Sequence, residues 1–210
     1  MHHFEKENNP IWHPFTQMKI ADEPIHIDSA KGSLLYTKDG RAIIDAISSW
    51  WVNIHGHAHP HIAHAIAEQA KKLEQVIFAG FTHQPAIDLA NKLIEILPPH
   101  FSKVFFSDNG STSVEVAIKM ALQYWDNQGI THKTNIIAFD NAYHGDTFGA
   151  MSVGGKSTFN KAFQKHLFQV HHIPLPTAEN IEEVKAAFKQ LVSDDSVAAF
   201  IFEPLVQGAA

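Results

Sequence analysis

The chain has 210 residues, a formal net charge of −6 and no cysteine. The acidic balance gives no reason to expect nucleic-acid binding, and the lack of Cys excludes disulfides and thiolate metal sites and fits a reducing cytoplasm. Apolar residues make up 45% and charged residues 18%, as in a soluble enzyme with one large domain or two small ones. We expect no membrane span, because no apolar run approaches ~18 residues, and no secretory signal in MHHFEKENNP.

Short β-like runs come first, between Pro24 and Asp45, around the turn Lys38-Asp39-Gly40. They lie at residues 25–27, 34–36 and 43–44. Runs of this length around a glycine turn predict a small antiparallel meander.

From Pro60 onward the pattern alternates between helix and strand. We expect helices over Pro60–Val76 and Pro85–Leu97, the second ended by Pro98-Pro99. The later elements are strand 103–106, helix 111–127, strands 135–139 and 168–173, helix 178–192 and strand 197–202. This alternation predicts a mostly parallel sheet covered by helices.

The most informative stretch is KVFFSDNGSTSVEVAIKMALQY, residues 103–124. Val104–Phe106 is predicted to be a buried strand, Ser107–Gly110 a turn, and Ser111 the start of an amphipathic helix. The first turn of a helix offers unpaired N–H groups, to which Gly110 adds close approach and Ser111 and Thr112 add hydroxyls. The residues alone leave an equal alternative, in which Ser and Thr only cap the helix.

The segment SDNGSTSVEVAIKMALQYW resembles the cofactor-phosphate segment of fold-type I, class III aminotransferases, which use pyridoxal 5′-phosphate. Three further segments narrow the resemblance: IWHPFTQM at 11–18, SSWWVNIHGHAHP at 48–60 and YHGDTFGAMS at 143–152. Together they resemble the branch of the family that acts in biotin synthesis. Its members move an amino group from S-adenosylmethionine to 8-amino-7-oxononanoate, giving 7,8-diaminononanoate.

The resemblance implies that residues 1–59 are the N-terminal segment of a small domain and residues 60–210 the first part of the large cofactor-binding domain. It also implies a homodimer. The family's pyridinium Asp, Schiff-base Lys and substrate Arg come later in its chains, so no residue here takes those catalytic roles. We therefore expect a truncated chain that is inactive alone, in which Lys71, Lys72 and Lys119 are solvated helix residues.

By the resemblance, Gly110, Ser111 and Thr112 hold the cofactor phosphate, Tyr143 stacks on the cofactor, and His144 assists. Without the family, Tyr143 is more readily a packed, half-buried residue. His144 has the simpler alternative of capping a loop.

The resemblance also assigns substrate contacts to Tyr143, Trp50, Trp51 and Phe15. A tryptophan pair alone would instead indicate a core or a subunit interface. Phe15 is a departure, because better-known members have a Tyr there that helps to recognise 8-amino-7-oxononanoate. Glu203 follows the last predicted strand, at the edge where open α/β sheets bind ligands, and we expect it to support the active site. The alternative for Glu203 is an exposed carboxylate at a strand end.

A cluster of histidines offers another class of function. Clustered His can bind Zn²⁺, but Gly56 and Pro60 interrupt any regular strand and no carboxylate or Cys completes a set, so we predict no metal site. A metal-binding module, a non-catalytic fragment and another class III aminotransferase (ornithine, 4-aminobutyrate or omega-amino acid type) remain alternatives, and lysine remains an alternative amino donor. The histidines are His55, His57, His59, His61 and His64.

Overall fold

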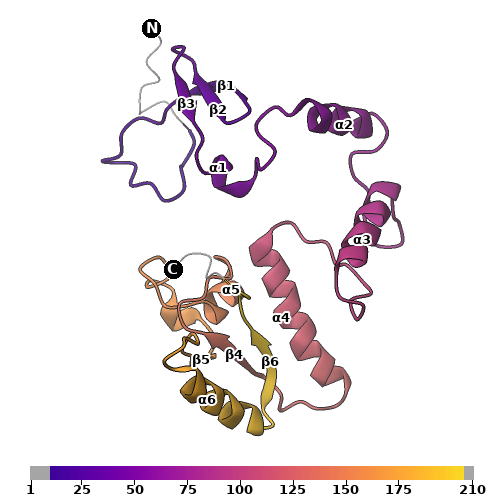
Figure 1. The fold of residues 1–210 in the computed structure, drawn as a ribbon, viewed down its shortest axis with the longest axis vertical. Helices are drawn as coiled ribbons and strands as arrows, with labels where there is room; N and C mark the ends of the chain where they lie inside the picture. Colours follow the sequence, from indigo (N-terminus) through magenta and orange to yellow (C-terminus); the bar gives the residue numbers. More distant parts are fainter. Residues whose placement is uncertain (1–9, 206–210) are drawn as a thin grey trace. The chain divides into compact units, whose positions relative to one another are not determined.

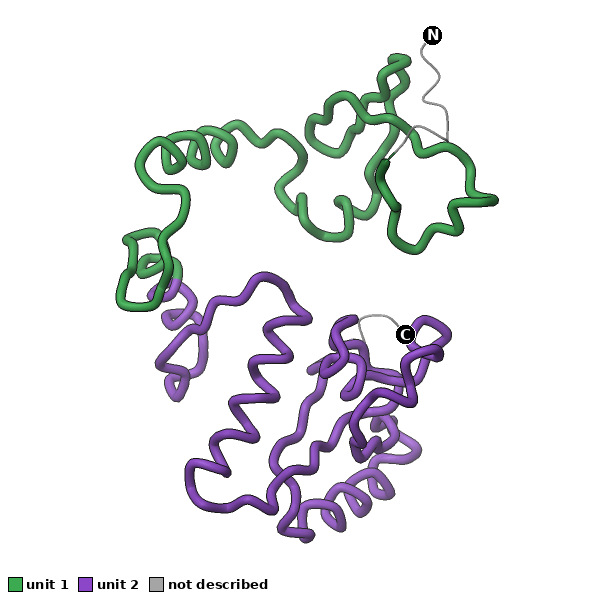
Figure 2. Tube along the Cα trace, turned by 180° about the vertical axis from the view of Figure 1, so that it is seen from behind, with its two compact units in different colours: residues 1–89 green, residues 90–210 purple. Residues whose placement is uncertain are grey.

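The computed structural model describes residues 10–205. It divides into two compact units, residues 1–89 and 90–210 (Figure 2). The boundary between the units falls inside helix α3 (Gln84–Ile96). The predicted division at residues 59 and 60 into small and large domains stays a prediction. Residues 1–9, which fall in the segment predicted to carry no secretory signal, and residues 206–210 lie outside the described residues.

The first unit contains the antiparallel meander that the sequence predicts. Its strands pair in the order β1 (Ile27–Lys31), β2 (Leu34–Thr37) and β3 (Ala42–Ile44). The β2–β3 turn is specified locally, because Gly40 takes a positive φ of 86° and its N–H donates to the Thr37 carbonyl at 2.9 Å. The Thr37 hydroxyl also accepts a hydrogen bond from the Arg41 N–H at 2.9 Å.

Helix α2 (Pro60–Ala70) and the first part of α3 belong to the first unit, and the rest of α3 belongs to the second. The Pro start of α2 is confirmed, although the helix ends before the predicted Val76. No residue of either helix is buried, and Ile62 and Ile66 on the predicted apolar face of α2 are 38% and 65% exposed. Among the described residues, the two helices therefore lack the cover that amphipathic helices normally find.

The second unit is an α/β layer structure around a parallel sheet in the order β5-β4-β6 (Figure 1). This confirms the predicted fold class. Strand β5 is shorter than predicted, and the helix α5 and a short 3₁₀ helix were not predicted. The elements are α4 (Gly110–Asn127), β4 (Asn135–Phe139), α5 (Phe148–Val153), the 3₁₀ helix (Gln164–His166), β5 (His171–Ile173), α6 (Ile181–Ser193) and β6 (Val197–Ile201).

Both faces of the central strand of this sheet, β4, are buried. Ile136 packs in a cluster with Ile118 of α4 and Val153 of α5. The next residue of β4, Ile137, packs on the other face with Val184 of α6. Successive side chains of a strand point to opposite faces, so α4 and α6 cover opposite sides of the sheet, as Figure 1 shows. Burial of each such side chain stabilises the folded unit by about 1.5–3 kcal/mol, and this packing holds the helices against the sheet.

The predicted buried strand at 103–106 is wrong. Among residues 10–205 no strand pairs with this segment, and Phe105 is 64% exposed. An apolar run becomes a strand only when a neighbour satisfies its backbone groups, and no described segment does so here. No helix in the described part of the chain is both long and apolar enough to cross a bilayer.

Candidate functional site

The start of α4 is built by a reciprocal cap. The Asn109 side chain accepts from the Thr112 N–H at 3.0 Å, and the Thr112 hydroxyl accepts from the Asn109 N–H at 3.1 Å. The Ser107 hydroxyl donates to Thr112 Oγ1 at 2.7 Å. This capping box is why the 18-residue helix begins at Gly110. It also engages the Thr112 hydroxyl, so the predicted ligand role of Thr112 stays a prediction with a competing structural use.

Gly110 and Ser111 occupy the first turn, where N–H groups have no partner within the helix and the dipole is positive. A Cβ added to Gly110 would meet no atom within 4 Å, so the space beside this backbone is open. The Ser111 hydroxyl oxygen accepts from the Asp146 N–H at 3.1 Å, which leaves its hydrogen for another acceptor. These groups fit a phosphate in both charge and access.

The loop that follows β4 closes against this helix start. Gly145 has a φ of 125°, and a Cβ at this position would lie 2.2 Å from Ser111 Oγ. The Tyr143 hydroxyl donates to Asp146 Oδ2 at 2.8 Å, within the same loop. The loop therefore needs a glycine to bring the Asp146 amide to Ser111.

Tyr143 also connects the loop to the end of β6. Its N–H donates to Glu203 Oε1 at 2.9 Å. Tyr143 as a whole is 45% exposed, so part of it is available to a planar ligand. Burial, together with the hydrogen bond to the Asp146 carboxylate, raises the pKa of the Tyr143 phenol. The phenol therefore stays protonated and donates at neutral pH.

His144 lies partly buried beside Tyr143. Burial lowers the pKa of its imidazole, the Glu203 carboxylate opposes that effect, and His172 reinforces it. The ring is thus held neutral at pH 7. Its Nε2 is buried and has no hydrogen-bond partner among residues 10–205. A buried ring nitrogen of this kind is usually satisfied in the functional state, which fits a bound polar group nearby.

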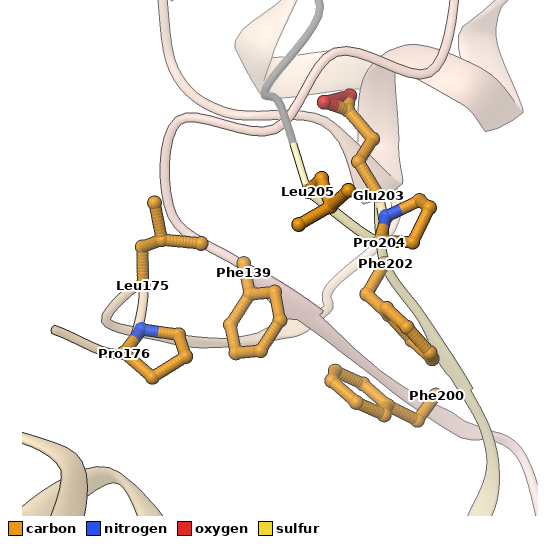
Figure 3. A pocket seen from close by; sticks show the side chains of 8 residues that line it. All are labelled: Phe139, Leu175, Pro176, Phe200, Phe202, Glu203, Pro204 and Leu205. Carbon is orange, nitrogen blue, oxygen red and sulfur yellow. The ribbon is translucent and has the colours of Figure 1, made fainter.

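An apolar hollow of about 340 Å³ lies at the carboxyl ends of the strands and shares Glu203 with this group of residues (Figure 3). The rings of Phe139, Phe200 and Phe202 form its floor, whereas the Glu203 carboxylate points away from them. The hollow lacks the convergent polar groups that orient a small ligand. We therefore place the cofactor candidates at the α4 start and the Tyr143 loop, not in this hollow. Its remaining lining residues are Leu175, Pro176, Pro204 and Leu205.

The predicted substrate residues of the first unit form a second group. Phe15 and Trp50 meet edge to face, with ring centroids 5.7 Å apart. They are 70% and 59% exposed, and Trp51 is 73% exposed. The alternative in which the tryptophan pair is part of a core is wrong for this unit. The substrate roles of Phe15, Trp50 and Trp51 stay predictions.

Three residues of the second unit were missed by the sequence reasoning. Asp146 and Gly145 follow Tyr143-His144 directly, so the local YHGD pattern offered a signal. Glu115 offered none, because its partners lie more than 30 residues away: Oε1 accepts from the Thr147 hydroxyl and from the Gly149 N–H at 2.7 Å. Glu115 thereby ties α4 to the start of α5.

The histidine-rich segment was expected to hold no metal. Across residues 10–205 no group of three or more His, Asp or Glu side chains is placed to share a metal ion. His57 instead contacts a carboxylate of its own unit, Asp45, at 2.7 Å.

Comparison with known proteins places this geometry in context. Residues 17–210 match the family "Aminotransferase class-III". The chain is 56% identical over 207 residues to the adenosylmethionine-8-amino-7-oxononanoate aminotransferase of Synechococcus elongatus, covering 95% of this chain and 49% of that protein. Its identity to the Staphylococcus aureus enzyme of the same name is 40%, covering 98% of this chain and 49% of that protein. The chain spans about half the length of the curated relatives it matches.

Two solved structures show the same fold. One is the adenosylmethionine-8-amino-7-oxononanoate aminotransferase of Methanocaldococcus jannaschii, with a TM-score of 0.88 and 38% identity over 97% of this chain and 46% of that one. The other is an amine transaminase from an uncultivated Pseudomonas species in its PLP-bound form, with a TM-score of 0.81 and 29% identity over 95% and 49%. The fold-type I architecture inferred from the sequence is confirmed.

Proposed function

The chain belongs to the class III aminotransferases, a family of pyridoxal-phosphate-dependent transaminases, and we propose that it acts in biotin synthesis. In this proposal, the enzyme to which the chain belongs moves an amino group from S-adenosylmethionine to 8-amino-7-oxononanoate. The names and identities of the relatives support these substrates, since the biotin-pathway enzymes are 40–56% identical to the chain and the amine transaminase is 29% identical.

The observation that carries the proposal is the junction of Ser111, Asp146, Tyr143 and Glu203. Through three hydrogen bonds it joins the first turn of α4, the loop after β4 and the end of β6. Parallel α/β sheets bind ligands at this edge, outside the carboxyl ends of their strands.

Each residue at the junction has a role that its chemistry allows. The Gly110 and Ser111 amides and the Ser111 hydroxyl hold the cofactor phosphate, and the exposed Tyr143 ring lies against the cofactor plane. Glu203 fixes the Tyr143 backbone, and the neutral His144 offers a ring nitrogen to a polar group. Bound pyridoxal phosphate supplies the electron sink for transamination, while the protein supplies binding and orientation.

In this proposal, side chains of the first unit bind the amino acceptor, 8-amino-7-oxononanoate. Phe15 and Trp50 form an edge-to-face aromatic wall that suits the apolar chain of 8-amino-7-oxononanoate. Phe15 contributes no hydroxyl, so recognition at this position rests on apolar contact alone. Lysine is the competing amino donor.

We further propose that the 210-residue chain does not turn over, because the family resemblance leads us to expect that none of its lysines takes the role of the covalent lysine. It assembles with a second copy, and its cytoplasmic location stays a prediction. Borohydride treatment with pyridoxal phosphate, followed by peptide mass mapping, is expected to label no single dominant Lys. Measurable conversion of S-adenosylmethionine and 8-amino-7-oxononanoate by the purified chain would contradict this part.

The phosphate assignment has its own test, a titration of the purified chain with pyridoxal 5′-phosphate. Ser111→Ala removes a charge-assisted hydrogen bond worth roughly 1.5–3 kcal/mol, so the Kd rises about ten- to hundredfold while the backbone donors keep some affinity. Ser113→Ala is the matched control, because the Ser113 hydroxyl sits in the same turn but donates to the Asn109 carbonyl at 2.9 Å. An unchanged Kd for Ser111→Ala, or an equal loss in both variants, contradicts the assignment.

A further inference from the structure

The turn α1 (Ser48–Trp51), which carries the neighbouring Trp50 and Trp51, has an unusual backbone. Ser48, Ser49, Trp50 and Trp51 have φ angles of 50°, 48°, 58° and 66°. L-residues visit this left-handed region singly, because Cβ crowds the following carbonyl oxygen. Four in succession, with no glycine among them, need an outside constraint to persist.

The surrounding structure supplies that constraint through one carboxylate. Asp45 Oδ2 accepts from the Ser49 hydroxyl at 2.7 Å and lies 2.7 Å from His57 Nε2. The Asp45 side chain is 5% exposed and the His57 side chain 14%, so water competes little for these bonds. The Ser49 N–H, then His57, then the Ser49 hydroxyl hold the pKa of Asp45 down to about 2, so the carboxylate is charged at any physiological pH.

His57 is in turn fixed to the β-sheet of the unit. Its N–H donates to the Gly32 carbonyl at 2.8 Å, and the Gly32 N–H donates back to the His57 carbonyl at 3.1 Å. Gly32 is in the connection between β1 and β2. Asp45 is held as well, since its N–H donates to the Ser33 carbonyl at 2.8 Å. Both sides of the turn are thus tied to the same hairpin.

We propose that Asp45, with Ser49 and His57, forms a clasp that holds this left-handed turn and thereby positions Trp50 against Phe15. Asp45 is a positioning residue, because it acts through Trp50 and not on a ligand. The clasp itself rests only on the geometry of the first unit. Its consequence for substrate recognition rests on the proposed function.

The test uses the purified 210-residue chain with Trp50 as its sole tryptophan, Trp12, Trp51 and Trp125 being replaced by Phe. In this background Phe15→Ala removes the ring that touches Trp50 and shifts its emission maximum and anisotropy. Asp45→Ala is expected to abolish that response, because Trp50 is then no longer held against Phe15. A response to Phe15→Ala that is the same with and without Asp45 overturns the proposal, as does no response in either chain.

Chymotrypsin cleavage with mass mapping gives a second readout in the unaltered tryptophan background. Asp45→Ala is expected to raise cleavage after Trp50 and Trp51 at least about tenfold relative to cleavage after Phe159, which lies in the other unit. Adding Ser48→Gly to Asp45→Ala removes backbone strain at one position of the turn, so it is expected to lower this relative cleavage about fivefold again. Ser49→Ala, which keeps the Asp45–His57 contact, gives an intermediate increase and serves if Asp45→Ala is poorly folded.

Asp39→Ala is the matched control, because Asp39 is also hydrogen-bonded within this small sheet but does not contact the turn. It is expected to change cleavage after Trp50 and Trp51 less than about twofold. Equal effects of Asp39→Ala and Asp45→Ala, or no effect of Asp45→Ala, overturn the clasp. These readouts need neither cofactor nor substrate, so their failure would leave the proposed function standing, and the failure of that function would leave the clasp standing.

Discussion

Replacing Gly145 by Ala perturbs the candidate site at its tightest point. The new Cβ would lie 2.2 Å from Ser111 Oγ and 2.8 Å from Ser111 Cα, and the Cα belongs to backbone that cannot rotate away. The residue would also keep a φ of 125°, which L-residues rarely adopt. Backbone strain of this kind costs about 1–3 kcal/mol and overpacking another 1–3 kcal/mol. Because the loop relaxes in part, we expect a loss of about 3 kcal/mol in the free energy of unfolding of the second unit.

Gly129→Ala separates strain from contact. Gly129 also has a positive φ, 75°, but a Cβ there would meet no atom within 4 Å. Its replacement therefore costs only the backbone term, about 1 kcal/mol. The difference of about 2 kcal/mol between the two variants combines the contact of the Tyr143 loop with Ser111 and the greater strain of an Ala at a φ of 125° than at 75°.

Urea unfolding followed by Trp125 fluorescence, in a background with Trp12, Trp50 and Trp51 replaced by Phe, measures this difference. Trp125 reports on the second unit, since its Nε1 donates to the Ala198 carbonyl at 2.9 Å. With a slope of about 2 kcal/mol per molar urea, the midpoint for Gly145→Ala falls about 1 M below that for Gly129→Ala. Midpoints within about 0.3 M of each other would refute the close packing of the loop on α4.

Three further outcomes are expected. Because the pKa of Asp45 is about 2 in the folded chain and its usual value is 3.8, the carboxylate stabilises the first unit above pH ~4, and this stability is lost as the pH falls toward 2. An acid titration followed by circular dichroism is expected to show this loss in the unaltered chain and not in Asp45→Asn. Glu115→Ala destabilises the second unit by about 2–3 kcal/mol in urea unfolding, because three donors lose their acceptor. The control Glu182→Ala, which removes an exposed pair with Lys185, costs less than about 0.5 kcal/mol, and equal losses in the two variants would contradict the role of Glu115. Light scattering after size exclusion shows a dimer or larger species, since α2 and α3 bury no residue in the described chain; a monodisperse monomer at micromolar concentration would count against this.

The elements that could be predicted are those with a local cause. Helix α4 starts within one residue of its prediction because Asn109 and Thr112 cap it locally. Strand β4 matches its prediction, 135–139, because an apolar run of strand length is buried on both faces. The antiparallel meander follows from its glycine turn.

The elements that could not be predicted depend on distant partners. Residues 103–106 have a strand-like sequence, but pairing is decided by a neighbour that the described chain does not supply. The left-handed turn at 48–51 has no glycine to signal it, because its constraint comes from His57 and the hairpin behind it. No signal in the sequence indicated the role of Glu115, because its partners come more than 30 residues later. For the same reason, the sequence named Tyr143 and Glu203 but not the hydrogen bond that joins them.

The central claim is that the start of α4 holds the phosphate end of the cofactor. The most direct measurement compares the Kd of the purified chain for pyridoxal 5′-phosphate with its Kd for pyridoxal, which differs only in lacking the phosphate. The account predicts at least tenfold tighter binding of the phosphorylated compound, because the first-turn amides and the Ser111 hydroxyl contact only that group. Equal affinity for the two compounds would contradict it.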